Sequence, residues 1–277
     1  MSTPRRGIFL HNHCIPRDPA VAVEIAMRAE ELGYDSVWAA EHVVLPSPRV
    51  PPSPMEPEDP IGDPIVLLAH LAARTERVLL GTGVLVLPQR NPLVLAKQLA
   101  TLDVLSRGRL VVGVGAGYLE PELTAIGVPM ATRGARTDAY LAAMRSLWED
   151  LEPAADGDFV RFSGVDAHPR PVQRPLPVVI GGESPAAWRR AARFAQGWYG
   201  FRLSVAEVTE QVAGLRRAEA AAGRTDRLEV TVTPDAPLDD DSQRAYAAAG
   251  VDRLVVAPRP DADLATLRRW LERNAPS

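Results

Sequence analysis

Two apolar runs decide the fold of this chain, Val78-Leu79-Leu80-Gly81-Thr82-Gly83-Val84-Leu85-Val86-Leu87-Pro88 and Arg109-Leu110-Val111-Val112-Gly113-Val114-Gly115-Ala116-Gly117-Tyr118. A helical segment separates them, with Asn91 as its N-cap, Pro92 at its first position and Gly108 just past its end. Continuous apolarity, without alternation, is typical of parallel strands that are covered on both faces. The stretch therefore predicts a β-α-β unit.

The same alternation of strand and helix extends outward over the whole chain. Further strands are expected at residues 6–10, 34–40, 178–182, 197–201, 228–233 and 253–257. Helices are expected at residues 18–32, 63–74, 91–105, 120–126, 133–151, 186–196, from 204 onward, 240–249 and 263–273. Eight such units without a composition break predict one α/β domain over residues 1–277, a closed (β/α)8 TIM barrel with a hairpin excursion at residues 156–177. An open doubly wound sheet is the alternative.

Composition and charge narrow the classes of partner. The chain has 277 residues, 46% of them hydrophobic, and a net charge of −4 without a basic stripe, so nucleic acid is not an expected partner. A single cysteine, Cys14, suits a reducing cytosol. The apolar run near the N-terminus, residues 8–10, is too short for a signal peptide, and no stretch is long enough to span a membrane. We expect a cytosolic protein without a membrane partner.

The lysine count excludes two classes of enzyme. Lys97 is the only lysine and lies in the middle of the helix expected at residues 91–105. Schiff-base aldolases and pyridoxal-phosphate enzymes need a lysine in the active site. A lysine on a covering helix is a surface charge, so neither chemistry is expected.

The glycine run at the end of the fourth strand invites a dinucleotide-binding interpretation. The fingerprint Gly-x-Gly-x-x-Gly, counted from Gly113, requires a glycine where Tyr118 stands, so the match fails. Gly115 and Gly117, like Gly83 on the preceding strand, instead indicate a strand end that leaves room for a bulky flat ligand.

His11 and His13 follow the first strand in a His-x-His pattern that metal-dependent barrel hydrolases also carry. A metal site needs further ligands at later strand ends, but His70 is inside a helix and His168 lies in the proline-rich excursion. We therefore expect no metal, and interpret His11 as a polar contact to a ligand or a solvated loop residue.

An anion site is predicted where the fifth strand meets its helix. Gly181 and Gly182 end the strand, and Glu183 and Ser184 lead at once into helix 186–196. The unpaired amides and the dipole of a helix N-terminus bind phosphate. An ordinary Ser-Pro helix start is the alternative, and the paired glycines favour the ligand.

Glu41 and His42 end the second strand. A neutral imidazole at this position could donate a hydrogen bond to a cofactor carbonyl or move a proton near neutral pH. The alternative is a structural histidine bonded to a loop carbonyl.

At these residues the chain resembles the luciferase-like flavin- or deazaflavin-dependent oxidoreductases, a barrel superfamily, over nearly its whole length. The similarity is strongest to the actinobacterial branch that uses coenzyme F420. The similarity rests on several short motifs, each of which is a weak signal alone but which together, in this order, are specific. They are residues 31–38 with Glu41-His42, Gly81-Thr82-Gly83-Val84 with Asn91-Pro92, residues 105–109 leading into 113–117, and Gly181-Gly182 with Gln196-Gly197-Trp198.

The resemblance implies a place for each part of the cofactor. The isoalloxazine or deazaisoalloxazine ring would lie against a bulge at the end of the third strand, often with a cis peptide, here between Gly83 and Val84. His42 would lie beside the ring. Gly181 and Gly182 would follow the phosphate arm, in agreement with the anion site.

One departure from the family concerns acid/base chemistry. In the deazaflavin sugar-phosphate dehydrogenases of this superfamily a glutamate follows the Gly-x-Gly run, whereas here Tyr118 stands there and Glu120 and Glu122 come later. A phenol with a pKa near 10 is a poor base but a fair hydrogen-bond donor. Sugar-phosphate oxidation is therefore not expected, and the catalytic candidates are His42, Tyr118 and Glu120.

The resulting prediction is an oxidoreductase that exchanges a hydride between F420, or alternatively FMN, and a small organic substrate. Trp38, Trp198 and Tyr199 would supply apolar walls, and the proline-dense loop at residues 46–60 would cover the substrate. An FMN enzyme would be a monooxygenase with a separate flavin reductase. A non-catalytic flavin-binding relative is a further alternative, and the resemblance implies a homodimer.

Overall fold

Eight parallel strands close into a barrel in the computed structural model, which describes residues 3–10, 18–259 and 262–276. In barrel order they are β1 (Arg5–Phe9), β2 (Ser36–Ala39), β3 (Leu79–Thr82), β5 (Leu110–Gly115), β8 (Val178–Gly181), β9 (Gly197–Leu203), β10 (Glu229–Pro234) and β11 (Arg253–Val256). β11 pairs with β1 and β3 pairs with β5, all in parallel. The predicted closed barrel is confirmed, and the open sheet is wrong because no strand of the barrel is left at an edge.

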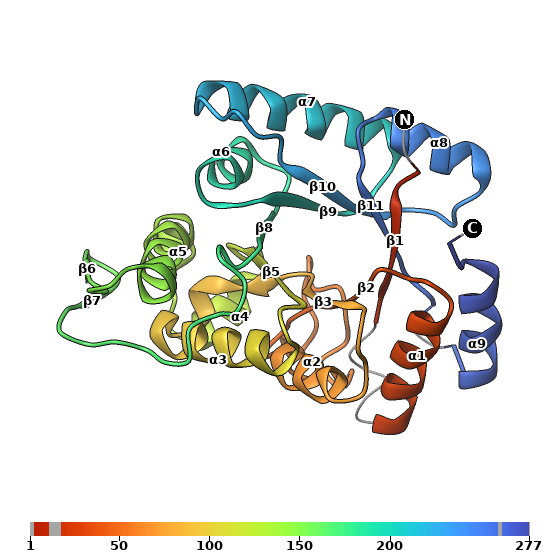
Figure 1. Cartoon of the computed structure of the whole chain (residues 1–277), viewed down its shortest axis with the longest axis horizontal. Coiled ribbons are helices and arrows are strands. Elements are labelled where there is room, and N and C mark those ends of the chain that lie inside the picture. The colour runs from red at the N-terminus through yellow and green to blue at the C-terminus, as the bar shows by residue number, and fades with distance from the viewer. Residues whose placement is uncertain (1–2, 11–17, 260–261, 277) are drawn as a thin grey trace.

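Helices surround the strands as an outer layer (Figure 1). They are α1 (Pro19–Glu31), α2 (Pro64–Ala72), α3 (Pro92–Leu105), α4 (Glu120–Ala125), α5 (Arg133–Glu149), α6 (Pro185–Phe194), α7 (Val205–Ala221), α8 (Asp240–Ala248) and α9 (Leu264–Arg273). Four of them begin as the sequence indicates, with the side chain of Asp18, Asp63, Asn91 or Ser184 accepting a hydrogen bond from a first-turn amide, followed by a proline. No helix in the described ranges is long and apolar enough to cross a membrane.

The strands expected at residues 34–40 and 78–88 differ from the observed ones for reasons that the structure shows. The strand expected at residues 34–40 begins at Ser36, because Tyr34 turns into the core and its hydroxyl donates to the carbonyl of Leu271 at 2.9 Å. The run from Val78 to Pro88 is interrupted: β3 ends at Thr82, and a two-residue strand β4 (Leu85–Val86) and a short 3-10 helix η2 (Leu87–Gln89) follow. The interruption is the bulge described below.

The hairpin excursion lies outside the barrel, beyond α5 (Figure 1). Its strands β6 (Ala155–Asp156) and β7 (Arg161–Phe162) pair antiparallel, and the rest of the excursion has no regular structure. Asp103 of α3 fixes the part of the excursion that leads back to the barrel, because one carboxylate oxygen accepts hydrogen bonds from the amides of Val172 and Gln173 at 2.7 and 3.0 Å.

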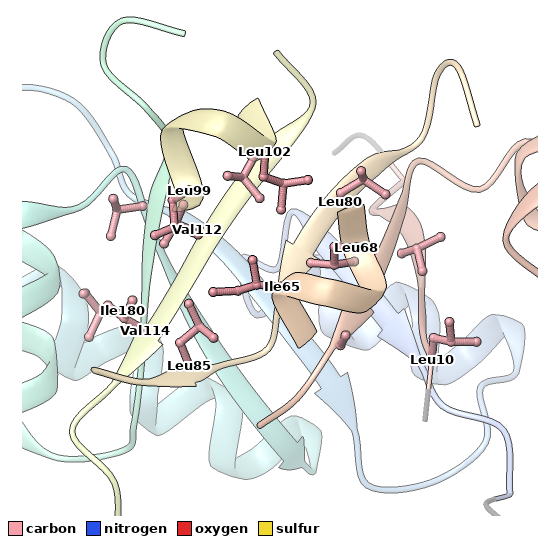
Figure 2. Close-up of a cluster of buried hydrophobic side chains, with 14 of the residues drawn as sticks. Leu10, Ile65, Leu68, Leu80, Leu85, Leu99, Leu102, Val112, Val114 and Ile180 are labelled. Atoms are coloured by element: carbon pink, nitrogen blue, oxygen red, sulfur yellow. The ribbon is translucent and has the colours of Figure 1, made fainter. Parts of the chain in front are cut away.

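The main core fills the space between the strands and the helices. Figure 2 shows side chains from several barrel strands facing apolar residues of α2 and α3, namely Leu80, Val112, Val114 and Ile180 opposite Ile65, Leu68, Leu99 and Leu102. A second cluster fills the barrel itself and consists of Phe9, Trp38, Val111, Val179, Tyr199 and Val255. Both faces of the strands are therefore apolar, which explains why the sequence shows continuous runs.

An ion-pair cluster closes the amino-terminal end of the barrel. Arg253, at the start of β11, is only 2% exposed; its Nε donates to Asp35 Oδ2 at 2.8 Å, and its guanidinium also pairs with Glu229. The guanidinium carbon lies 5.8 Å from the ring of Trp38. A buried, fully paired cation leaves no room for a ligand at this end, so any site in the barrel opens at the carboxyl-terminal ends of the strands.

Candidate active site

A β-bulge shapes the end of β3. Gly81 pairs with Val111 and Leu85 pairs with Val114, so three residues on one strand face two on the other. The Thr82 hydroxyl replaces the missing ladder bonds, because Oγ1 accepts from the amide of Gly113 at 2.7 Å and donates to its carbonyl at 2.7 Å. The peptide bond between Gly83 and Val84 is cis, as the resemblance implied.

Glycines on the neighbouring strands make room for this bulge. A Cβ on Gly113 would lie 1.9 Å from the carbonyl oxygen of Thr82, so no other residue fits there. The side chain of Val84 points into the barrel mouth, where it lies 3.0 Å from the positions that a Cβ would take on Gly115 and on Gly181. The ends of β5 and β8 therefore meet at Val84, and the structure brings these predicted residues together at one mouth.

Gly117 has a different role. Its backbone has a φ of +82°, and a Cβ there would lie 2.7 Å from Cγ1 of Val86 and close to Leu123. A left-handed conformation and close packing on β4 both require glycine at this position. Gly117 thus supports the bulge from behind, whereas Gly115 faces Val84.

Stacked aromatic rings run up the barrel axis to the mouth. Tyr199 stacks on Trp38 at 5.3 Å and on Phe201 at 6.5 Å, and Phe201 contacts Phe9 at 5.3 Å. Phe201 is 43% exposed at the open end. The Tyr199 hydroxyl is 2.7 Å from Thr233 Oγ1, and burial raises the pKa of Tyr199 well above its usual value. The rings form an apolar floor beneath the mouth.

Trp198 lies on the other face of β9. Its ring is fully buried in the core between the strands and the helices, away from the aromatic rings of the barrel interior. Its Nε1 donates to the carbonyl of Gly182 at 2.8 Å. Of the two neighbouring aromatic residues, the structure therefore places only Tyr199 inside the barrel, while Trp198 holds the backbone of the predicted anion site.

His42 and Glu122 form a nearly buried pair beside the mouth. His42 Nδ1 is 3.0 Å from Oε2 of Glu122, and the other oxygen of Glu122 accepts from the amide of Val43 at 2.6 Å. The side chains of His42 and Glu122 are 10% and 2% exposed. The carboxylate favours a proton on Nδ1, and Nε2 has no hydrogen-bond partner among the described residues, so a ligand can bind to Nε2.

Glu122, rather than Glu120, is the carboxylate that reaches His42. Glu120 is the exposed first residue of α4, while Glu122 lies on its buried side. The sequence shows two glutamates two residues apart, which point to different sides of a helix, and only the packing of α4 decides between them.

The ring of Tyr118 meets that of His42 edge-on, with the centroids 6.1 Å apart. Tyr118 is 50% exposed. Burial, and then the charge of Glu122, raise the pKa of Tyr118, so it stays a protonated hydrogen-bond donor at neutral pH.

Glu41, for which the sequence predicted no role, fixes the strand after the bulge. Its Oε2 accepts from the amide of Val86 at 2.7 Å, and its Oε1 accepts from Arg90 Nε at 2.7 Å. Burial raises the pKa of the Glu41 carboxyl, and the charge of Arg90 opposes that rise. The residue before His42 thus connects the end of β2 to β4.

Gly182, Glu183 and Ser184 connect β8 to the N-terminus of α6. Gly182 has a φ of +119°, which favours glycine, and Ser184 Oγ accepts from the amide of Ala187 at 3.3 Å. All three residues are exposed. Neighbouring atoms still remove part of the water around the Glu183 carboxyl, and this desolvation, followed by the charge of Glu207, raises the pKa of Glu183. The turn follows Gly181, so it lies at the same mouth as Val84.

The prediction for His11 falls outside the described residues, as does His13. Within the ranges that the structure describes, no three histidine, cysteine, aspartate or glutamate side chains gather as a metal site. A surface groove between α1, α2 and α9 follows the outer helix layer and contains none of the predicted site residues.

A family model described as luciferase-like monooxygenase matches residues 5–276. The chain belongs to the luciferase-like monooxygenase family. This membership agrees with the family that the sequence resembles, and members of the luciferase-like family are oxidoreductases.

Three similar proteins illustrate the range of relatives. An uncharacterised protein of Mycobacterium tuberculosis (strain ATCC 25618 / H37Rv) is 35% identical over 268 residues, which cover 93% of this chain and 92% of that protein. An F420-dependent glucose-6-phosphate dehydrogenase of Kineococcus radiotolerans is 30% identical, over 82% of this chain and 66% of that protein. The solved structure of monooxygenase RslO1 from Streptomyces bottropensis is 26% identical, covers 96% of each chain and has a TM-score of 0.78.

Proposed function

We propose that this luciferase-like barrel binds coenzyme F420 and exchanges a hydride between it and a small organic substrate. One observation carries the proposal: the bulge at Gly83 and Val84, the His42–Glu122 pair and the glycine turn before α6 all lie at the carboxyl-terminal mouth. The relative named as an F420-dependent dehydrogenase supports this choice of cofactor.

The residues at the mouth suit the parts of such a cofactor. The bulge presents the small backbone of Gly83 and the Val84 side chain, a flat apolar surface for one face of a ring. The turn at residues 182–184 presents helix-start amides, which bind a phosphate arm. A Cβ on Gly115 or on Gly181 would crowd Val84, so both glycines make room for the Val84 side chain at the mouth.

His42 would carry out the proton transfer. When bound, F420 supplies a carbon centre that accepts or donates a hydride. Glu122 holds the Nδ1 proton of His42, so Nε2 can take a proton from a substrate hydroxyl or return one to a carbonyl oxygen. Tyr118, protonated at neutral pH, donates a hydrogen bond to the same substrate oxygen. Phe201 and the proline-dense loop limit the access of water.

FMN is the second candidate cofactor, because the similar solved structure is that of a monooxygenase. Both cofactors have a flat tricyclic ring and a phosphate, but a carbon replaces one ring nitrogen in F420, whereas reduced FMN reacts with oxygen and needs a separate reductase. Titrating the ligand-free protein with F420 and with FMN, while following absorbance and fluorescence, separates them. We expect F420 to bind more tightly, and binding of neither would refute the proposal.

A matched pair of variants locates the binding. In Gly115→Ala the new methyl group lies 3.0 Å from Val84, whereas in Gly134→Ala, on α5, the nearest atom, in Arg190, is 3.6 Å away, an ordinary van der Waals contact. Gly115→Ala should weaken F420 binding roughly tenfold, which is about 1.4 kcal/mol, and Gly134→Ala should leave it unchanged. Tight binding with no turnover across alcohols, aldehydes and enones would indicate the non-catalytic alternative.

A further inference from the structure

The loop between β2 and α2 contains a proline-rich segment with its own internal hydrogen bonds. Residues 44–61, called the proline segment below, include seven prolines. Arg49 donates from Nε and Nη2 to the carbonyl of Ser53 at 3.2 and 3.0 Å, and the Ser53 hydroxyl donates to Met55 O at 2.8 Å. Among the described residues, every hydrogen bond of the segment joins two of its own members. Internal bonds and fixed proline φ angles make it stiff.

One guanidinium joins the two ends of the loop that carries this segment. Arg90 Nε donates to Glu41 Oε1 at 2.7 Å, just before the segment, and Arg90 Nη2 donates to Asp63 Oδ2 at 2.6 Å, just after it. The Arg90 side chain is 15% exposed and that of Glu41 only 1%, so solvent screens the Glu41 contact little.

Arg90 itself comes from a third element. It follows η2, the 3-10 helix after the bulge, and its partner Glu41 also accepts from the amide of Val86 in β4. The other partner, Asp63, is fixed by its second role, because Oδ1 accepts from the first amides of α2. The base of the loop and the bulge are therefore parts of one network of charged hydrogen bonds.

We infer that Arg90 is a positioning residue that closes the base of the proline segment and holds it in register with the bulge. A planar guanidinium can donate to two carboxylates at once, a geometry that a lysine ammonium does not provide. Without Arg90 the segment would keep its own internal bonds and the anchors at Val43 and Asp63, but its two ends would no longer be joined to each other. That a cofactor lies beneath the segment rests on the proposed function, whereas the clamp itself does not.

Limited digestion of the ligand-free protein with trypsin tests the clamp, because Arg49 is the only lysine or arginine in the segment. Cleavage after Arg49, followed by mass spectrometry, should be roughly tenfold faster in Arg90→Gln than in the wild type, because the rate follows the fraction of molecules in which the proline segment is open. Asp63→Asn keeps the Oδ1 acceptor for α2 and removes the charge, so it should give a smaller increase in a fully folded protein.

Arg28→Gln is the matched control. Arg28 also donates to two carboxylates, those of Glu31 and Glu272, but it lies on the outer helices. The Arg28→Gln variant should be cleaved after Arg49 at the wild-type rate. Cleavage after Arg244, on α8, reports on general unfolding. Equal rates after Arg49 in the wild type and Arg90→Gln, or equal acceleration at Arg49 and Arg244, would overturn the inference.

A cofactor arm separates this inference from the proposed function. F420, and FMN in a parallel series, should slow cleavage after Arg49 in the wild type, and their affinity should fall roughly tenfold in Arg90→Gln. Were neither to bind the wild type, the proposed function would fail, while digestion of the ligand-free variants would still decide the role of Arg90. Unchanged affinity in Arg90→Gln would refute the coupling to the bulge.

Discussion

At the scale of single residues, the site depends on charges that are buried next to their partners. Glu122 is 2% exposed and bonds both His42 and the amide of Val43. A buried carboxylate is stable only when hydrogen bonds replace its water, and here two donors do so. The same carboxylate orients the imidazole of His42. Glu122 therefore both stabilises the chain after β2 and keeps Nε2 of His42 available to a ligand.

Glu122→Gln should lower kcat/KM by roughly a hundredfold, because the amide keeps the shape but loses the charge that stabilises a protonated imidazole. Cofactor affinity, which depends on the bulge and the anion turn, should stay within about twofold. The control is Glu120→Gln, at an exposed position on the same helix, with an expected loss under about twofold. Steady-state kinetics and a binding titration of all three proteins would check this, and equal losses at the two glutamates would contradict it.

Glu183→Gln should tighten binding of a phosphate-bearing cofactor by roughly three- to tenfold. Partial desolvation and the charge of Glu207 raise the pKa of Glu183, and its carboxylate lies in the turn where the phosphate would bind. Removing the carboxylate removes its repulsion of the phosphate. Isothermal titration with F420 would measure the effect, and Glu210→Gln on the outer helix α7 is the control. Weaker binding in Glu183→Gln would place the phosphate elsewhere.

At the scale of elements, the bulge is a joint product of β3 and β5. Thr82 supplies the hydrogen bonds that the extra residue interrupts, and Gly113 supplies the space into which the carbonyl of Thr82 points. Neither strand would adopt this geometry alone. The sequence indicated a special strand end through its glycines, but the position of the extra residue follows from the pairing register, which a single sequence does not contain.

Thr82→Val should destabilise the protein by about 1–3 kcal/mol, because it leaves the buried amide and carbonyl of Gly113 without their partner. A domain of this size should lose roughly 2–4 °C in Tm per kcal/mol. Thr101→Val removes a hydroxyl that bonds only to the carbonyl of Lys97 one turn earlier in α3, so its effect should stay within about 0.5 kcal/mol. Thermal denaturation followed by circular dichroism would compare them, and similar losses would argue against the bridging role.

At the scale of the whole molecule, buried tyrosines join elements that are distant along the chain. Tyr34, Tyr199 and Tyr246 are each 3% exposed, in the helix layer, the barrel interior and on α8. Burial raises the pKa of all three, and for Tyr246, where Asp235 adds to the effect, to about 12. Their phenols ionise in the unfolded chain near pH 10 but not in the fold.

The fold should therefore lose stability as the pH rises above 10. The folded pKa values lie above the unfolded ones, so the stabilising contribution is complete below pH 10 and is lost toward the folded values. Each tyrosine can contribute up to about 1.4 kcal/mol per pH unit. The Tm between pH 9 and pH 12, with phenolate absorbance, would check this, and Tyr34→Phe should give a shallower decline. A constant Tm over this range would contradict it.

The sequence by itself determined the architecture. Continuous apolar runs predicted strands with two covered faces, and the pairs Asp18-Pro19, Asp63-Pro64, Asn91-Pro92 and Ser184-Pro185 marked four helix starts correctly. These signals are local, because a helix cap or a strand's apolarity involves neighbours along the chain. For the same reason the glycines of the strand ends could be assigned to the mouth before any contact was known.

Only the tertiary structure decided which side chains meet. It paired His42 with Glu122 instead of Glu120, turned Trp198 away from the interior that Tyr199 fills, and joined Glu41 and Asp63 through Arg90. These contacts connect residues 16 to 80 positions apart in the chain or depend on which face of an element is buried. Closure of the barrel fixes them, because closure sets the register between strands and the side from which each helix packs.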